Sequence, residues 1–271
     1  MPKFSEYPET GSFDTDDILI KDGTNGTKKI KAMNAFISCL VDMSVVNRRN
    51  IYRGICIGEE FTTTQLEEIQ NGTFNDMFVG DYWTIGEVDW VIADFDYWMK
   101  TGDTVCTSHH VVIVPKTVLY TASYGSATAV GYGSSTMRSS TLESAKTTIN
   151  TAFNSNVLTH RAFLPTTVST DGYATAGSWF DSTVELLSEV MLFGARLLGN
   201  RGTAVPEGLY TADNRQLALF RLDPTAYRSS GEYWLRDYVA DSNYAGVTSW
   251  GLISSHAKYL SKGVRPVFAI G

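Results

Sequence analysis

The sequence predicts an α+β protein with more strand than helix. From Ile51 to the end of the 271-residue chain, short runs of β-branched and aromatic residues alternate with turns rich in Gly, Asn, Asp and Ser. Two or three helical segments stand among these strands in mixed order, without a regular βαβ alternation or an internal repeat. A hydrophobic content of 43% is enough to build a sizeable core. We therefore expect one large domain over residues 51–271.

Composition and charge exclude several classes of function. The chain carries 29 acidic and 22 basic residues, and no Lys/Arg cluster forms a stripe that could follow a phosphate backbone. The polar N-terminus has no apolar signal region, and no apolar run approaches the ~18 residues that span a bilayer. We expect a protein made in the cytoplasm, with no nucleic-acid partner and no membrane insertion. Three cysteines without zinc or CxxC spacing predict buried free thiols and no metal: Cys39, Cys56 and Cys106.

The first fifty residues divide into an arm and a helix. Residues 1–29 are polar, with one short apolar run at 18–20 and the turn signals Asp22-Gly23 and Asn25-Gly26. Residues 30–50 carry apolar side chains at helical spacing, namely Ile30, Met33, Ile37 and Leu40. Two heptads are too short for an independent helix, so this stripe must pack on something. It packs either on its own domain or on copies of itself about a symmetry axis.

Local signals then define the elements up to Pro115. Thr64 and Glu67 have capping-box spacing and predict a short helix that ends at Asn71-Gly72. Residues 81–98 alternate aromatic and aliphatic side chains around Gly86-Glu87, which predicts a hairpin. The β-branched run 111–115 predicts a buried strand.

The middle of the chain is expected to hold a polar loop and two more helices. Residues 120–140 are rich in Gly, Ser, Thr, Ala and Tyr and predict an ordered loop of low charge. A capping box at 140–143 predicts a helix that continues to Phe153. A similar box at 182–185 predicts a third helix that ends near Gly194 or Gly199. Its apolar face is expected to comprise Leu186, Leu187, Val190, Met191 and Phe193.

The last forty residues contain the strongest functional signal. Their two ends are apolar and aromatic, which predicts buried strands, whereas the middle is rich in Ser, Asn, Tyr, Gly and Thr. Tyr and Trp offer large contact areas with few rotatable bonds, and Ser and Asn adapt their hydrogen bonds, as in antibody paratopes. We therefore expect the segment between the ends to be displayed and to bind a ligand. The candidate ligand-binding residues are Tyr238, Asn243, Tyr244, Trp250, His256 and Tyr259.

Catalytic constellations are weak in this sequence. Asp94 and Asp96 would face one way on a strand and could act on a glycoside, but the pattern favours a place on the exposed side of a half-buried strand. His109 and His110 are adjacent, so on a strand they point apart and cannot chelate one metal; one is expected to cap the core. No complete nucleophile elbow, phosphate loop, zinc-protease helix or EF-hand loop occurs. We expect no enzyme activity and no cofactor.

Several longer motifs are similar to one group of proteins. They are Gly80–Trp83 (GDYW), Ile92–Trp98 (IADFDYW), Thr101–His110 (TGDTVCTSHH), Gly177–Leu186 (GSWFDSTVEL), Trp234–Asp237 (WLRD) and Gly263–Phe268 (GVRPVF). These motifs resemble virion proteins of phages and prophages from Gram-positive gut bacteria, which end in a C-type-lectin-like domain also seen in targets of diversity-generating retroelements. The leading segment 16–30 resembles attachment segments of phage tail and head-fibre proteins.

The resemblance implies a lectin-like fold whose binding face lies between the Trp-Leu-Arg strand and the final strand. Trp234, Arg236 and Arg265 would then form its framework. The calcium-site triplets of sugar-binding lectins are absent. Formylglycine-generating enzymes share the same broad fold and use a cysteine pair late in the chain, whereas all three cysteines here precede residue 107. The implied protein is a virion component, of the tail-fibre or head-fibre type. It would bind a host-surface glycan or protein and contact other virion proteins through its arm, as a homotrimer. A purely structural decoration protein and a glycosidase using the Asp pair are the alternatives.

Overall fold

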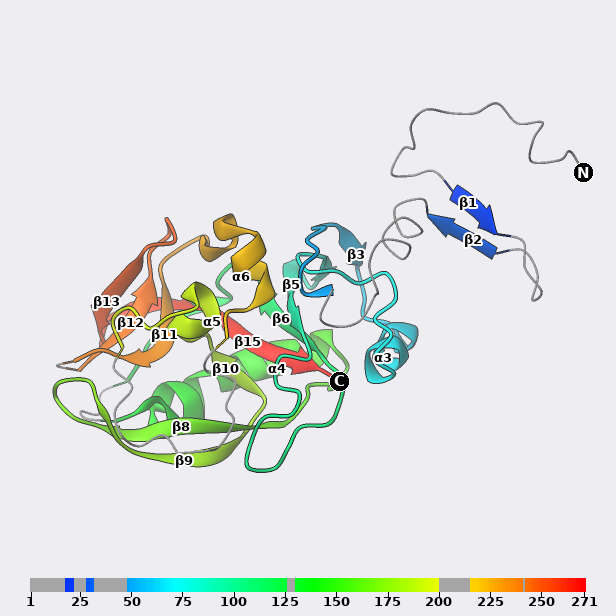
Figure 1. Cartoon of the computed structure of the whole chain (residues 1–271). Helices are drawn as coiled ribbons and strands as arrows, with labels where there is room; N and C mark the ends of the chain where they lie inside the picture. Colours follow the sequence, from blue (N-terminus) through cyan, green and yellow to red (C-terminus); the bar gives the residue numbers. More distant parts are fainter. Residues whose placement is uncertain (1–17, 22–27, 32–47, 126–129, 200–214, 241) are drawn as a thin grey trace, which may run out of the picture. The chain divides into compact units, whose positions relative to one another are not determined.

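The computed structural model describes residues 18–21, 28–31, 48–125, 130–199, 215–240 and 242–271 (Figure 1). The chain forms two compact units, residues 1–47 and residues 48–271. The first unit contains a hairpin in which β1 (Ile18–Lys21) pairs antiparallel with β2 (Lys28–Lys31). The expected strand at 18–20 is confirmed. The expected helix over 30–50 is wrong at its start, because Ile30 pairs with Leu19 in the hairpin, and residues 32–47 lie outside the described part.

The second unit is built around a six-stranded sheet. In spatial order its strands are β10 (Val184–Leu186), β15 (Pro266–Ile270), β6 (Val111–Pro115), β5 (Val88–Phe95), β4 (Tyr82–Ile85) and β3 (Cys56–Gly58). The predicted hairpin is confirmed, since Gly86 and Glu87 both have positive φ, 61° and 66°, as a two-residue turn between β4 and β5 requires. The predicted strand β6 is buried along its whole length, so both faces of the sheet are covered at this strand.

A five-stranded sheet and a long hairpin complete the β-structure. The sheet has the order β13 (Ile253–Ala257), β12 (Asn243–Val247), β11 (Tyr233–Tyr238), β14 (Ser261–Val264) and β7 (Tyr120–Ser123). Within it, β11 and β14 run parallel, with Tyr233 opposite Gly263. The hairpin pairs β8 (His160–Val168) with β9 (Ala174–Ser182). The chain is thus a mixed α and β protein dominated by sheets, as expected.

The helices are few and short. They are α3 (Thr63–Gln70), α4 (Glu143–Ala152), α5 (Glu189–Phe193) and α6 (Ala218–Leu222), with 3₁₀ turns η2 (Tyr132–Ser134) and η4 (Pro224–Tyr227) and a π-turn η3 (Met137–Thr141). In the described part of the chain, no helix has the length and apolar character needed to cross a bilayer.

Each of the three expected helices is present, but each expected cap is wrong. In α3 the capping box joins Thr62 and Gln65, two residues before the predicted pair, because three consecutive threonines offer overlapping boxes. Before α4, Ser140 belongs to the π-turn and caps nothing. Before α5, residues 184–186 pair with β15 as a strand, and the helix begins only after Ser188, whose hydroxyl accepts a hydrogen bond from the Met191 amide at 3.2 Å.

An aromatic cluster joins α4 to the six-stranded sheet. Phe153 follows α4 directly and is fully buried. Its ring meets Trp83, Trp90 and Phe268 at centroid distances of 5.9, 5.7 and 5.4 Å, in edge-to-face or tilted geometry. Such pairs add roughly 0.5–1.5 kcal/mol each to the stabilisation that comes from burial. The cluster fixes residues 153, 83–90 and 268, which are far apart in the sequence, in one core.

Candidate functional site

The predicted binding segment forms the outer half of the five-stranded sheet. Strands β12 and β13 are a hairpin with the register Tyr244 to His256 and Val247 to Ile253, and β13 is the edge strand. Successive residues of a strand point to opposite faces. About half of the segment must therefore face the interior, which a simple displayed loop would not do.

Three of the candidate residues are buried. Tyr238, Tyr244 and His256 are only 8%, 3% and 9% exposed, contrary to the expected display. Tyr244 stacks on Tyr124 with ring centroids 3.5 Å apart, and its hydroxyl donates to the Val130 carbonyl at 2.6 Å. Burial raises the pKa of Tyr244, because the charged phenolate would lose its hydration. These side chains support the sheet and are not available to a ligand in this structure.

His256 occupies a space that a glycine leaves open. A Cβ at Gly246 would lie 2.6 Å from the His256 ring, so only glycine fits opposite this histidine. The ring also meets Trp234 edge-to-face at 5.8 Å. Its Nε2 atom is buried without a hydrogen-bond partner among the described residues, and burial lowers the pKa of His256. The residue that the sequence singled out as the functional histidine is thus part of the core.

The remaining candidates lie at two separate tips. Trp250 is 74% exposed in the turn between β12 and β13, and Tyr259 is 75% exposed in the turn after β13. Asn243 is half-buried at the start of β12. The five-residue strand β13 separates the two turns by roughly 16 Å. The structure does not bring Trp250 and Tyr259 together.

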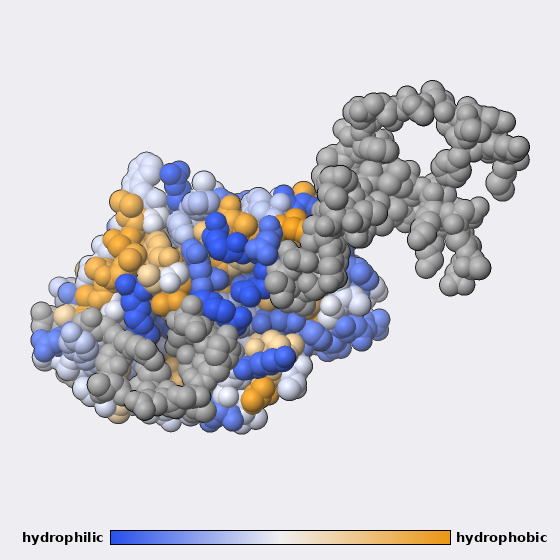
Figure 2. All heavy atoms as spheres, viewed as in Figure 1, coloured by the Kyte–Doolittle hydropathy of each residue, from blue (hydrophilic) through white to orange (hydrophobic). Residues whose placement is uncertain are grey.

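The Trp250 tip carries additional apolar surface. Leu252, in the same turn, is 66% exposed. In Figure 2, hydrophobic residues gather on the side of the molecule where Figure 1 places β11, β12 and β13. Exposed apolar residues that gather on one surface are typical of interaction sites. Trp250 and Leu252 thus form an exposed apolar surface at this end of the predicted segment.

The residues expected as framework lie beneath this surface or beside it. Trp234 is fully buried, and its indole N–H donates to the Ala122 carbonyl at 2.8 Å. Arg265 is 1% exposed and ties the end of β6 to η4 through the Pro115 and Ala226 carbonyls, both at 2.9 Å. Arg236 is half-buried on β11.

The carboxylates that the sequence considered for catalysis are buried and hydrogen-bonded. Asp94 is fully buried and receives a two-pronged ion pair from Arg49, together with the Phe95 amide at 2.8 Å and the Ala218 amide at 3.2 Å. The exposed position expected for the pair is wrong, because residues 90–95 of β5 are all buried and both faces of this strand are therefore covered. Their oxygens are engaged by internal donors.

Asp96 organises the two adjacent histidines. Its carboxylate accepts from the His110 amide at 2.8 Å and lies 2.8 Å from Nδ1 of His109. His110 is fully buried, and its Nε2 accepts from the Trp98 amide at 3.0 Å, so the expected core-capping histidine is confirmed as His110. Burial lowers the pKa of His110, although Asp96 and the Ser108 carbonyl oppose the shift.

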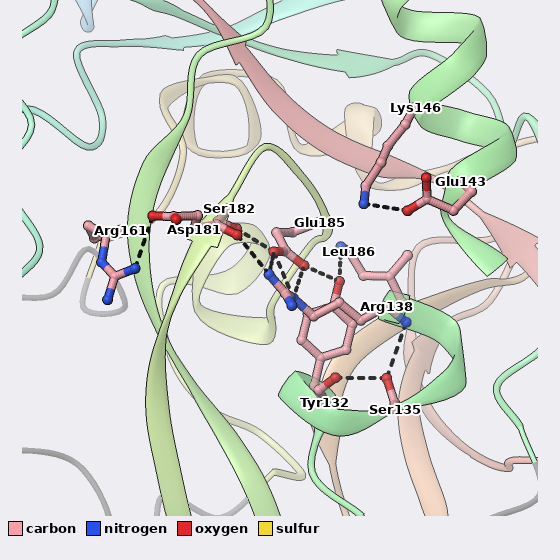
Figure 3. Close-up of polar contacts among 10 residues, drawn as sticks. All are labelled: Tyr132, Ser135, Arg138, Glu143, Lys146, Arg161, Asp181, Ser182, Glu185 and Leu186. Carbon is pink, nitrogen blue, oxygen red and sulfur yellow. Dashed lines mark hydrogen bonds and ion pairs between the residues drawn. The ribbon is translucent and has the colours of Figure 1, made fainter. Parts of the chain in front are cut away.

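Glu185 is another buried carboxylate whose oxygens accept hydrogen bonds from several internal donors (Figure 3). It accepts from the Tyr132 hydroxyl at 2.6 Å, from Arg138 Nε at 3.0 Å and from the Ser182 hydroxyl. The Tyr132 hydroxyl in turn accepts from the Leu186 amide at 2.9 Å. This network joins η2, η3 and the β9–β10 connection and has the character of a structural brace.

The described residues contain no group of three or more His, Cys, Asp or Glu side chains placed to hold a metal ion. Of the cysteines, Cys106 is buried as expected, and Cys39 lies outside the described residues. Cys56 is exposed, which contradicts the prediction, because β3 is the edge strand of the six-stranded sheet.

One cavity among the described residues is a groove that the sequence did not indicate. It has a volume of about 320 Å³ and lies between the β4–β5 end of the six-stranded sheet and η4. Tyr52 and Arg228 are exposed at its rim, whereas Val91, Leu219 and Arg265 are buried and form its floor. The lining comes from five distant stretches of chain, so no local spacing could have revealed it.

The groove adjoins the Trp250 tip. A Cβ at Gly251, the residue after Trp250, would lie 3.0 Å from the Tyr227 Cβ and 3.6 Å from the Arg228 Cγ. The β12–β13 turn therefore packs directly on residues 227–228, and Arg228 lines the groove. The tip and the groove lie side by side in the second unit.

This geometry defines a sheet-rich α and β protein with an exposed apolar tip beside a charged groove. No known family model matches the chain, and no curated protein or solved structure matches it either.

Proposed function

We propose that the protein is a phage virion component, of the fibre or receptor-binding type, whose C-terminal lectin-like fold binds a ligand on the host surface. The motifs that resemble such proteins support this proposal. Two of them lie on neighbouring strands: Trp234–Asp237 is on β11, Gly263–Phe268 begins on β14, and these strands meet where Tyr233, just before the first motif, pairs with Gly263. Strand β11 also pairs with β12, which leads into the Trp250 tip.

The observation that carries the proposal is the exposure of Trp250. Trp250 is 74% exposed on a turn whose two ends are paired strands, so a ligand that covers it needs to order the side chain and little of the backbone. Aromatic residues of this kind dominate the free energy of many interfaces. Residues 1–47 would attach the protein to other virion proteins and assemble it as a trimer, so that several weak sites act together.

Point substitution tests this function better than a scrambled segment, because Tyr244 and His256 are buried and scrambling would unfold the sheet. We expect Trp250→Ala to weaken adsorption of the protein to host cells by about thirtyfold, the size of an interface hot spot. Tyr173→Ala, which removes another exposed aromatic side chain in the β8–β9 turn, is the matched control. Unchanged adsorption of the Trp250 variant contradicts the proposal.

A purely structural decoration role is the second candidate. Its support is the separation of Trp250 from Tyr259, since two apolar tips at opposite ends of β13 suit contacts with two neighbouring subunits. In that case Trp250→Ala leaves adsorption intact and reduces incorporation into the particle. Incorporation is measured from the protein content of purified particles.

A further inference from the structure

The floor of the groove contains a buried cation without a counterion. Arg265 is 1% exposed and has no carboxylate partner among the described residues. Two of its nitrogens are satisfied: Nε donates to the Pro115 carbonyl and Nη1 to the Ala226 carbonyl, both at 2.9 Å. The third nitrogen, Nη2, forms no hydrogen bond with these residues, while the guanidinium lies over the Tyr233 and Phe220 rings at 5.3 and 5.7 Å from their centroids. A buried charge is costly unless an opposite charge or hydrogen bonds offset it.

The rim of the groove is also positively charged. The exposed guanidinium of Arg228 forms no ion pair or hydrogen bond with any described residue. Lys116 also lines the groove and pairs with Asp89 at 3.0 Å. Among the lining residues described, the one carboxylate is that of Asp223, which accepts from the Thr225 amide and hydroxyl. Against the acidic net charge of −7, this groove is a local excess of positive charge.

The walls of the groove are aromatic and hydroxylated. The Tyr52 ring is held against glycine backbone, since a Cβ at Gly80 would lie 2.2 Å from it, and its hydroxyl meets Asp223 at 3.3 Å. Tyr82 forms another part of the wall, with the Lys116 ammonium 5.2 Å from its ring centroid. Aromatic side chains offer flat apolar faces, while Thr and Ser hydroxyls exchange hydrogen bonds with a polar ligand.

From this combination we infer that the groove binds a saccharide that carries an anionic group, a carboxylate or a phosphate. The anion would lie between Arg265 Nη2 and Arg228, and a sugar ring would cover Tyr52 or Tyr82. A volume of about 320 Å³ is at the lower end of ligand pockets and suits one or two sugar units. The inference rests on the proposed function, because a groove beside the Trp250 tip would meet the same host surface. Sugar binding by the groove can nevertheless be measured separately from cell adsorption.

Titration calorimetry on the full-length protein tests this inference. The probes are tri-galacturonic acid, glucose 1-phosphate, neutral maltotriose and inorganic phosphate. We expect one of the two anionic sugars to bind and the neutral sugar to bind at least about tenfold more weakly. Absence of binding by both anionic sugars overturns the inference. Equal affinity for inorganic phosphate and glucose 1-phosphate overturns the assignment to a saccharide.

Variants locate the site. Arg228→Gln removes an exposed guanidinium and is expected to weaken binding of the anionic sugar by about tenfold, and Tyr52→Ala by a similar factor. Lys146→Gln, which removes one positive charge on α4 outside the groove lining, is the control for net charge. Arg265→Lys is a further test when its thermal unfolding resembles that of the wild type. Unchanged affinity in Arg228→Gln contradicts the inference even if Arg265→Lys does not fold.

The two proposals fail in different measurements. Trp250→Ala is expected to reduce cell adsorption and leave binding of the soluble sugar within about twofold, because Trp250 does not line the groove. Arg228→Gln is expected to weaken binding of the anionic sugar as measured by calorimetry. If sugar binding is present and adsorption does not depend on Trp250, the tip proposal fails alone. If adsorption depends on Trp250 and no anionic sugar binds, the groove inference fails alone.

Discussion

Single buried residues make this protein sensitive to acid. His160 is 4% exposed, stacks on Trp98 at 4.0 Å, and has an Nδ1 atom without a partner among the described residues. Burial, together with His110 and Arg236, lowers the pKa of His160 to about 3 from an ordinary 6.5. Between these two pH values the unfolded chain binds a proton that the folded protein does not, so the free energy of unfolding falls as the pH falls.

We therefore expect His160→Phe to lose less stability than the wild type between pH 6.5 and pH 3. The difference should be on the order of a few kcal/mol, because each pKa unit corresponds to about 1.4 kcal/mol. Urea unfolding at several pH values measures it. Above about pH 8 this histidine is neutral in both states, so it adds no pH dependence there. Identical acid slopes for both proteins would show that His160 is not the titrating group.

Asp94 and Asp89 allow a matched comparison on one strand, β5. Asp94 is fully buried, forms an ion pair with Arg49 and accepts hydrogen bonds from two backbone amides. Asp89 is partly exposed and forms an ion pair with Lys116. We expect Asp94→Asn to lower the free energy of unfolding by about 3–5 kcal/mol, since it breaks a buried pair. Asp89→Asn should cost less than about 1 kcal/mol. Chemical denaturation compares the two, and equal losses would contradict the role of burial.

At the scale of elements, the β4–β5 turn contains a residue in an unfavourable conformation. Glu87 has φ of 66° in the left-handed region, where a side chain costs roughly 1 kcal/mol. Glu87→Gly should raise the free energy of unfolding by about 0.5–1 kcal/mol, whereas Glu87→Ala keeps the strain and should give no gain. Thermal unfolding of the two variants checks this. A gain for alanine equal to that for glycine would point to charge removal instead.

Elements with local signals could be predicted from the sequence, and those decided by distant partners could not. The β4–β5 hairpin has its turn and its alternation within fifteen residues, so pattern and structure agree. The burial of Tyr244 depends on Tyr124, which lies 120 residues earlier. Strand β10 was predicted as helix because its capping-like residues are local, while its partner β15 is about eighty residues away. The groove could not be predicted for the same reason, since five separate stretches of chain form it.

At the scale of the whole molecule, the second unit holds its own core. Arg48 donates to the Met77 and Thr73 carbonyls at 2.9 and 2.8 Å and marks where this unit begins. We expect a protein of residues 48–271 to unfold in one cooperative transition, with a midpoint within a few degrees of the full-length value. Circular dichroism on heating measures this, and a non-cooperative melt would contradict it. Sedimentation of both proteins tests whether residues 1–47 assemble the proposed trimer.

The position of β15 in the six-stranded sheet has a consequence for biosynthesis. This strand lies between β10 and β6, yet every other strand of the sheet precedes it in the chain. Until residues 266–270 leave the ribosome, the nascent chain presents the apolar edges of β6 and β10 without their partner, a state prone to aggregation. Chaperone binding should therefore persist until the end of this strand emerges. A premature stop before Pro266 should yield insoluble protein rather than a shortened, functional one.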